Sequence, residues 1–173
     1  MSDKDLAIQS FLSLADHPQG YSVRSVDLSE TKQFIYKIHY ARRMPPVSHS
    51  YGLVYNGELV GIVTYGIPAS QHLCRGICGE RLCLLYNRKN EASMLVSRSL
   101  KMLPRPKIVV SYADTAQGHT GFVYQACNFL FTGTTKERTD IAAGEGKHSR
   151  HSLGDAAKRQ KRSSKHRYVY FTG

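Results

Sequence analysis

The stretch SYADTAQGHTG, residues 111–121, holds side chains that can do chemistry, and it follows the short apolar run Ile108–Val110. That run is β-branched and too short for a helix, so we predict a buried strand. Open α/β sheets bind ligands beyond the carboxyl ends of their strands, and Asp114 stands at such a place. Its carboxylate is therefore a candidate metal ligand or general base. The alternative is a turn carboxylate that accepts hydrogen bonds from nearby backbone N–H groups.

His39 and Tyr40 form a second group of candidates, near the end of a helix that we predict to begin after Ser29. An imidazole and a carboxylate that leave coordination positions open suit non-haem Fe(II). We therefore predict that His39 and Asp114 are metal ligands and that Tyr40 lies in the same site. The alternative for His39 is a hydrogen-bonded histidine at the border of the core, next to Ile38.

Three more candidates stand at strand ends. Arg81 opens the run RLCLL, where an arginine holds a carboxylate or phosphate through two parallel hydrogen bonds, or is an ordinary surface residue. Tyr65 ends a strand in TYGIP, and it either lines the same cleft or packs within the sheet. Ser111, at the end of the strand that contains Ile108–Val110, completes the predicted catalytic set.

The elements that must position these residues are visible as patterns. Alternating residues predict a strand over 21–26. Ser29 is a good N-cap, and apolar residues recur on one helical face from Phe34 to Ala41. We predict that this helix ends near Arg42–Arg43, since basic residues suit a helix C-terminus.

The dipeptide Asn56–Gly57 joins two β-runs, and it favours the left-handed backbone of a type I′ turn, so we predict a hairpin. Farther along we predict a strand over 81–87, a helix capped by Asn90 and ended by Pro104, a strand over 107–114, a helix in GFVYQACNF and a short strand in LFTG. This order predicts an α+β fold with α/β character: a mixed, mostly antiparallel open sheet with flanking helices.

The net charge of +11 on 173 residues favours a polyanionic partner, with nucleic acid first. The alternative is a basic protein without such a partner. No window holds 18 consecutive apolar residues, so we expect no membrane partner. The N-terminus carries acids where a secretion signal has positive charge, and we therefore expect a cytoplasmic location.

The segment from Lys147 to Arg167 is rich in basic residues and contains one acid, Asp155. It is either a solvated tail or a DNA-contacting segment in which basic groups neutralise phosphates and Tyr168 and Tyr170 stack on bases. We predict a domain over 1–140, a flexible basic segment over 141–165 and a docking C-terminal strand over 166–173. The candidate DNA-binding residues are Arg150, Lys158, Arg159, Lys161, Arg162, Lys165 and Arg167.

The spacing of Cys74, Cys78 and Cys83 departs from the paired pattern of zinc sites. One of these cysteines, Cys83, also falls in a predicted strand. We therefore expect free thiols in a reducing compartment.

From Tyr21 to Gly133 the order of elements resembles the GNAT acyltransferase fold, with YQACNF near the place of its Y-x-x-x-G-F-like turn. The resemblance implies that Tyr124 is a general acid that protonates a leaving thiolate. The GNAT pyrophosphate loop contains glycines, whereas the equivalent stretch here, LYNRKNEAS, has none. The residues left to bind a cofactor phosphate are Arg88, Lys89, Asn90 and Ser93.

Five separated motifs resemble the Mom family of phage DNA-modification proteins: IHYARR, VGIVTYGIPAS, RLCLLYNRKNEASMLVSRSLK, VVSYADTAQGHTGFVYQACNFLFTG and KHRYVYF. The resemblance runs from Ile38 to the C-terminus. It implies a GNAT-like transferase that attaches a methylcarbamoyl group to adenine N6 in double-stranded DNA and so protects phage DNA from restriction. It also implies acetyl-coenzyme A or a related donor, and iron. The alternatives are an N-acetyltransferase acting on protein or small-molecule amines, and a non-enzymatic DNA-binding module.

Overall fold

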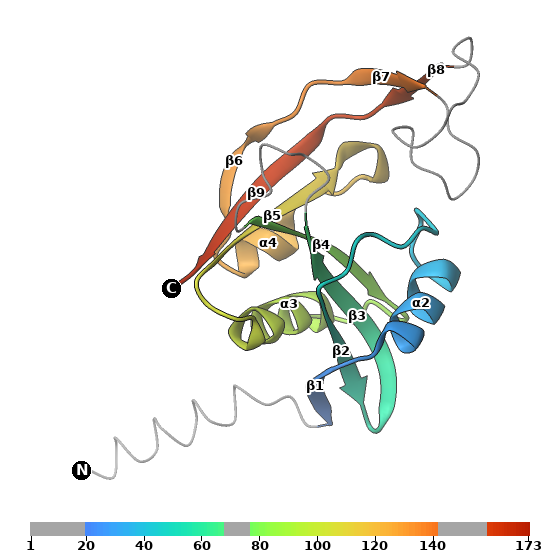
Figure 1. Cartoon of the computed structure of the whole chain (residues 1–173), viewed down its shortest axis with the longest axis vertical. Coiled ribbons are helices and arrows are strands. Elements are labelled where there is room, and N and C mark those ends of the chain that lie inside the picture. The colour runs from blue at the N-terminus through green and yellow to red at the C-terminus, as the bar shows by residue number, and fades with distance from the viewer. Residues whose placement is uncertain (1–19, 68–76, 142–158) are drawn as a thin grey trace.

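The computed structural model describes residues 20–67, 77–141 and 159–173. Seven strands form one open sheet in the order β1-β2-β3-β4-β5-β9-β6, and two short strands form a separate ribbon, β7-β8 (Figure 1). The sheet strands are β1 (Tyr21–Ser25), β2 (His49–Tyr55), β3 (Glu58–Gly66), β4 (Ile77–Leu84), β5 (Lys107–Asp114), β6 (Leu130–Thr134) and β9 (Lys165–Thr172). The ribbon consists of β7 (Arg138–Ile141) and β8 (Arg159–Arg162), and the helices are α2 (Leu28–Lys37), α3 (Glu91–Met102) and α4 (Phe122–Ala126).

The sheet is antiparallel except between β4 and β5. These two strands run parallel and pair only at their beginnings, Ile77–Gly79 with Ile108–Val110. Beyond Gly79 and Val110 they lose their mutual hydrogen bonds, although β4 continues to Leu84 and β5 to Asp114. The sheet is therefore split at the carboxyl ends of its two central strands, where ligands of open sheets bind.

Helices cover both faces of the sheet, with α2 on one side of β3 and α3 on the other (Figure 1). The side facing α3 buries Val63 and Tyr65 of β3 against Leu95 and Val96. The side facing α2 buries Ile62 and Cys83 against Ile35. Because successive strand residues point to opposite faces, Thr64 lies on the same side as Ile62, toward α2.

The predicted hairpin is confirmed. Asn56 and Gly57 have φ values of 47° and 86°, and Tyr55 pairs directly with Glu58. Both turn residues are left-handed, as a type I′ turn requires. The strand predicted over 107–114 is β5.

Both predicted ends of α2 are wrong. Asp27, not Ser29, is the N-cap: its carboxylate accepts from the backbone N–H of Glu30, whose side chain accepts from the N–H of Asp27. The helix ends at Lys37, so His39 and Tyr40 lie in the turn that follows it. There the His39 ring accepts a hydrogen bond from the backbone N–H of Ala41, a local bond that competes with helix continuation.

Two other predicted boundaries shift. The fourth strand begins at Ile77, before the predicted Arg81, and ends at Leu84. Asn90 occupies the N-cap position of α3 in a left-handed conformation, φ 67°, but its side chain makes no capping hydrogen bond. The predicted N-cap position is therefore confirmed, without the side-chain hydrogen bond that usually accompanies it.

The C-terminal residues contribute two strands. β9 lies between β5 and β6, pairing from Lys107↔Thr172 to Asp114↔Lys165 on one side and through Leu130↔Val169 on the other. Residues 159–162, which we expected to be flexible, form β8 and pair with β7. Among the described residues no helix is long and apolar enough to cross a membrane.

Candidate active site

A cleft of about 1370 Å³ opens where β4 and β5 separate. One wall is the segment after α2, from Ile38 to Pro46, and the floor includes Thr64 of β3 and Arg81–Leu84 of β4. The opposite wall comes from β5 and the turn that leads into α4, residues 117–124. Residues 135–138 and 162–165, at the base of the ribbon, form the rim.

The described lining of this cleft is cationic. It contains no aspartate or glutamate, and its lysines and arginines are Arg43, Arg81, Lys136, Arg138, Arg162 and Lys165. Three of these form ion pairs with aspartates outside the lining: Arg138 and Arg162 with Asp140, and Lys165 with Asp114. The other three form no ion pair with a described residue, so the cleft favours an anionic ligand.

His39 is buried at the cleft wall as a neutral imidazole. Burial, with the nearby charges of Arg81 and His119, lowers the pKa of His39 from 6.5 to about 4. Its Nδ1 accepts a hydrogen bond of 3.0 Å from the backbone N–H of Ala41, so the single ring proton is on Nε2. At neutral pH the ring therefore offers a hydrogen-bond donor rather than a base.

Tyr40 stacks on the His39 ring with centroids 4.5 Å apart, and its own ring is half exposed. The ring of His119, which also lines the cleft, lies edge-on to Tyr40 with ring centroids 6.2 Å apart. Burial and the charge of Asp114 raise the pKa of the Tyr40 hydroxyl, so the phenol stays protonated. These rings form an aromatic wall on which a planar ligand can stack.

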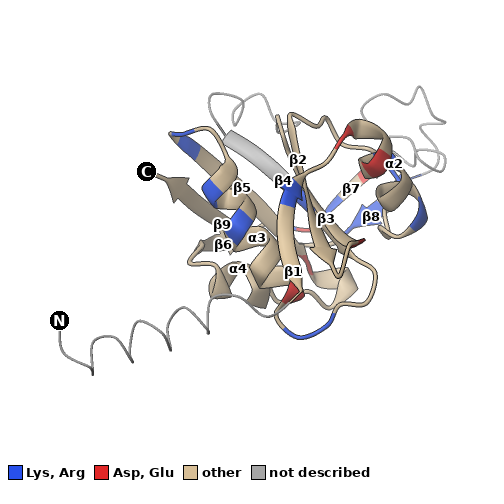
Figure 2. Ribbon diagram, turned by 90° about the horizontal axis from the view of Figure 1, so that it is seen from below, with Lys and Arg blue, Asp and Glu red and all other residues tan. Residues whose placement is uncertain are grey.

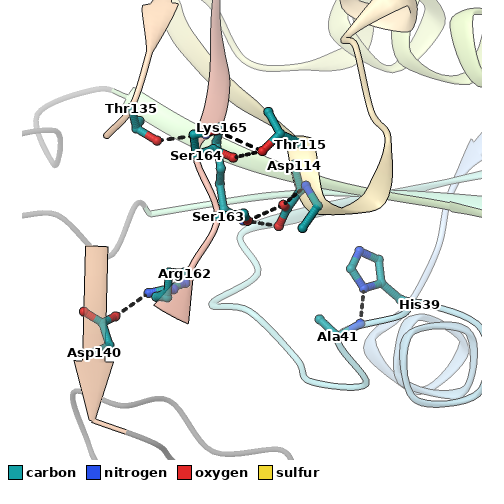
Figure 3. Close-up of polar contacts among 11 residues, drawn as sticks. His39, Ala41, Asp114, Thr115, Thr135, Asp140, Arg162, Ser163, Ser164 and Lys165 are labelled. Atoms are coloured by element: carbon teal, nitrogen blue, oxygen red, sulfur yellow. Dashed lines mark hydrogen bonds and ion pairs between the residues drawn. The ribbon is translucent and has the colours of Figure 1, made fainter. Parts of the chain in front are cut away.

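Asp114 is engaged by its own neighbours. Lys165 Nζ lies 2.7 Å from Oδ2, while the Ser163 hydroxyl and the backbone N–H of Ala116 donate to Oδ1 (Figure 3). Burial raises the pKa of this carboxyl, but hydrogen bonds from Lys165 and Ser163 outweigh that effect and hold the pKa below its usual range. Asp114 therefore ties the start of β9 to the end of β5.

The predicted iron site does not fit these residues. Within the part of the chain that the structure describes, no three side chains among His, Cys, Asp and Glu gather closely enough to hold a metal. The Nδ1 atom of His39 and both oxygens of Asp114 already have hydrogen-bond partners. Non-haem iron needs three such ligands, so we derive no step through iron.

Tyr124, the predicted general acid, lies at the cleft. It sits on α4 and borders the cleft, with its ring 5.4 Å from both Phe129 and Tyr168. Gly121 makes this possible, because a Cβ there would come 2.1 Å from the Tyr168 ring. The glycine lets the turn before α4 press onto Tyr168, whose hydroxyl donates to the Thr120 carbonyl at 2.8 Å.

Two predicted cleft residues lie elsewhere. Tyr65 is fully buried, points to the α3 side and shares a 2.6 Å hydrogen bond with Ser99. Ser111 is also buried and is not part of the cleft lining. Strand alternation explains the position of Tyr65, because its neighbour Thr64 points to the other face and lines the cleft.

The four residues predicted to bind a cofactor phosphate, Arg88, Lys89, Asn90 and Ser93, do not line the cleft. At this end of α3 the side chain of Glu91 is fully buried. Its carboxylate accepts from the Tyr21 hydroxyl at 2.9 Å and from the backbone N–H of Arg88 at 2.7 Å. A pyrophosphate at this helix end would meet that negative charge, so the residues do not fit coenzyme A bound in this manner.

The predicted DNA-contacting residues divide into groups. Arg159 and Lys161 are exposed on β8, and the basic colouring of that strand is visible in Figure 2. Arg162 and Lys165 line the cleft, whereas Arg167 is exposed on β9 and donates to the Thr132 side chain and carbonyl. Arg150 and Lys158 lie outside the described residues.

Of the predicted stacking tyrosines, Tyr168 is buried and Tyr170 packs against Phe129, so neither is free to stack on a base.

Sequence reasoning missed Thr64, Arg43 and Lys136, all of which line the cleft. The strand register explains why Thr64 lines the cleft, because Thr64 pairs across the strands with Arg81. A signal was present in the hairpin, since the alternation that puts Tyr65 on one face must put Thr64 on the other. Nothing in the local sequence marks Arg43 or Lys136.

Comparison with known proteins places the chain among relatives. The model of the Mom protein family matches residues 20–173. Over 126 residues, 64% of this chain and 52% of the relative, the chain is 31% identical to the methylcarbamoylase Mom of Escherichia phage Mu. The chain thus spans about half the length of that relative.

Solved structures show the fold. An acetyltransferase of Salmonella typhimurium, yncA, solved with its cofactor acetyl-CoA, superposes with a TM-score of 0.58 at 9% identity, covering 88% of this chain and 94% of that one. A GNAT-family acetyltransferase of Streptococcus pneumoniae superposes with a TM-score of 0.53 at 12% identity, covering 88% of this chain and 99% of that one. Arabidopsis thaliana NAA60 in complex with acetyl-CoA superposes with a TM-score of 0.55 at 15% identity, covering 87% of this chain and 98% of that one. These matches confirm the predicted GNAT-type fold.

Proposed function

The chain belongs to the Mom protein family, and from this premise we propose that it is a transferase that attaches a methylcarbamoyl group to adenine N6 in double-stranded DNA. The observation that carries the proposal is the split between β4 and β5, which opens a cleft whose described lining has six cations and no acid. The relative's name, methylcarbamoylase, supplies the group transferred. The GNAT-like fold supports a transferase.

The charge distribution supports DNA as the partner. The net charge is +11, and exposed basic residues on β8 continue from the cationic rim of the cleft. Lysines and arginines on such a surface neutralise phosphates without reading sequence. We therefore expect the rim and ribbon to hold the DNA backbone on either side of the target nucleotide.

The cleft is large enough for a flipped nucleotide together with a small donor, since typical ligand sites have roughly 300–1,000 Å³. Adenine N6 is stacked and paired within a duplex, so an enzyme that modifies it must take the base out of the stack. We propose that the extruded adenine stacks on the wall formed by Tyr40 and His39. His39 then offers its Nε2 proton to a base or donor atom.

Tyr124 is our proposed general acid. This residue borders the cleft, and a phenol hydroxyl can donate a proton. As adenine N6 forms its bond to the donor carbon and the bond to the leaving group breaks, Tyr124 would give its proton to the leaving group, and the proton that N6 loses would pass to water. Asp114 serves as a positioning residue in this scheme, because its carboxylate already binds Lys165 and Ser163.

The test is mass spectrometry of nucleosides from cells that express the protein. We expect a modified deoxyadenosine carrying the methylcarbamoyl mass, and at least a tenfold loss in Tyr124→Phe. The matched control is Tyr86→Phe, which removes a phenol on an exposed residue that does not line the cleft. Unmodified adenine in the presence of folded wild-type protein would contradict the proposal.

A further inference from the structure

Thr64 and Arg81 form an incomplete polar pair on the floor of the cleft. They are direct partners across β3 and β4, so their side chains lie on the same face of the sheet. Both border the cleft. The Thr64 side chain is buried, 1% exposed, and its hydroxyl oxygen has no hydrogen-bond partner among the described residues.

Arg81 also lacks a partner of opposite charge among the described residues. It is half-buried and forms no ion pair with any described residue. Burial and the like charge of Arg43 lower the pKa of the Arg81 guanidinium. A guanidinium presents five N–H donors and no acceptor, and the neutral His39 nearby offers one more N–H.

Buried polar groups in native proteins nearly always find a partner, and an unpaired one is costly. Thr64 is the residue whose side chain lacks one within the described part of the chain. A ligand oxygen placed against Arg81 and Thr64 would satisfy both groups at once. Among the described residues nothing supplies the acceptor that this arrangement needs.

The acceptor is unlike a phosphate of the DNA backbone. Thr64 is buried, whereas Lys136 and Arg138 are exposed residues of the cleft lining, where we expect the DNA backbone. The helix end that would otherwise attract an anion holds the carboxylate of Glu91. One guanidinium and one hydroxyl match the two oxygens and single charge of a carboxylate.

We propose that Arg81 and Thr64 form a subsite for a small carboxylate, through which the methylcarbamoyl donor is held in the cleft. Arg81 donates two parallel hydrogen bonds to the carboxylate oxygens, and the Thr64 hydroxyl donates a third. The assignment to a donor rests on the proposed function. The subsite itself rests on the chemistry of these two side chains.

The test is an NMR titration of the purified full chain with sodium acetate and, separately, inorganic phosphate. The probe is the Nε–H resonance of Arg81, identified by its loss in Arg81→Lys. We expect acetate to shift this resonance saturably and phosphate to bind more weakly. Equal or tighter binding of phosphate would overturn the carboxylate assignment.

Two variants separate binding from folding. Thr64→Val keeps the shape and removes the unpaired hydroxyl, so we expect an unchanged or higher melting temperature with a several-fold weaker acetate affinity. Arg81→Lys keeps the charge but loses the planar fork, and we expect at least a tenfold weaker affinity. The control is Arg88→Lys, outside the cleft, which should bind acetate like wild type. Wild-type affinity in both cleft variants would overturn the subsite.

The nucleoside assay distinguishes this inference from the proposed function. If wild type modifies adenine and both cleft variants do so equally well, the subsite is wrong and the function stands. If wild type binds acetate through Arg81 but leaves adenine unmodified, the function is wrong and the subsite stands.

Discussion

Arg81 and Arg88 lie only seven positions apart in the sequence, yet their surroundings are opposite. Arg88 is surrounded by partners: its guanidinium lies 4.4 Å and 4.9 Å from the centroids of Tyr86 and Tyr55 and 3.6 Å from the Glu91 carboxylate. Arg81 borders a cleft and has no ion-pair partner among the described residues. The first arginine is part of the structure, and the second is available to a ligand.

The same contrast explains how a GNAT-like fold can bind a different donor. At the start of α3 the chain fills the anion-binding position with its own carboxylate, Glu91. At the cleft, Arg81 has no ion-pair partner and the Thr64 hydroxyl has no hydrogen-bond partner among the described residues. In the proposed subsite, the anion is therefore bound by side chains on β3 and β4 rather than by a helix end.

The largest expected effect compares the two arginines directly. Arg81→Met should lower adenine modification about 100-fold, since truncating one side of a buried charge pair costs roughly 2–5 kcal/mol. Arg88→Met should leave modification within about threefold and lower the free energy of unfolding by about 1 kcal/mol or less, because its contacts are partly exposed. Nucleoside mass spectrometry and urea denaturation measure the two quantities. Equal losses of activity would remove the distinction.

Glu91→Ala should have the next largest effect, on stability. It leaves the half-buried Tyr21 hydroxyl and the Arg88 backbone N–H without their acceptor, so we expect a loss of about 3 kcal/mol in the free energy of unfolding. Modification per folded molecule should stay near wild type, as Glu91 does not line the cleft. The control is Glu58→Ala, at an exposed residue, which should change stability little. If Glu91→Ala abolished activity without loss of stability, α3 would belong to the site.

His39 should make stability depend on pH. Its pKa is about 4 in the folded chain and near 6.5 in the unfolded chain, so the unfolded state binds the proton more tightly. The free energy of unfolding should fall by on the order of 2 kcal/mol as pH drops from 6.5 to about 4. Below about pH 4 the ring is protonated in both states, so this residue should cause no further change. His39→Gln should remove that part of the pH dependence. An unchanged pH profile in the variant would mean that the ring is not held neutral.

The smallest expected effect lies at the ribbon. Lys161 is exposed on β8, and neutralising one phosphate contact should reduce the slope of log affinity against log salt by about 0.9. We therefore expect Lys161→Gln to weaken binding to duplex DNA of any sequence and to reduce the salt slope by this amount. Lys101→Gln, on α3, is the matched control and should leave the slope unchanged. Identical slopes in wild type and Lys161→Gln would place the DNA elsewhere.

Local patterns in the sequence were sufficient for several elements. Asn56–Gly57 specified the hairpin, since few dipeptides tolerate two left-handed residues in succession. The β-branched run before Ser111 specified β5. The end of α2 was missed because the Ala41 N–H donates to the His39 ring instead of continuing the helix, and helical periodicity does not reveal this bond.

The candidate site was only partly predictable. Residue type and position near a strand end brought Arg81, Asp114 and Tyr124 into consideration. In the structure Arg81 and Tyr124 line the cleft, whereas Asp114 forms an ion pair with Lys165, 51 residues away in the sequence. Contacts over that separation depend on the placement of β9 beside β5, which no local pattern contains.

The sequence by itself determined the charge, the main strands and helices, and the family resemblance, because these follow from composition and short-range periodicity. Only the tertiary structure decided which polar groups are satisfied and which are left open. Arg81 and Arg88 are the same residue type, and they stand on either side of one apolar stretch, Leu82–Tyr86. Their difference arises from Glu91 and two tyrosines packed around one and a split sheet beside the other. Such partners are assembled only when distant strands pack together.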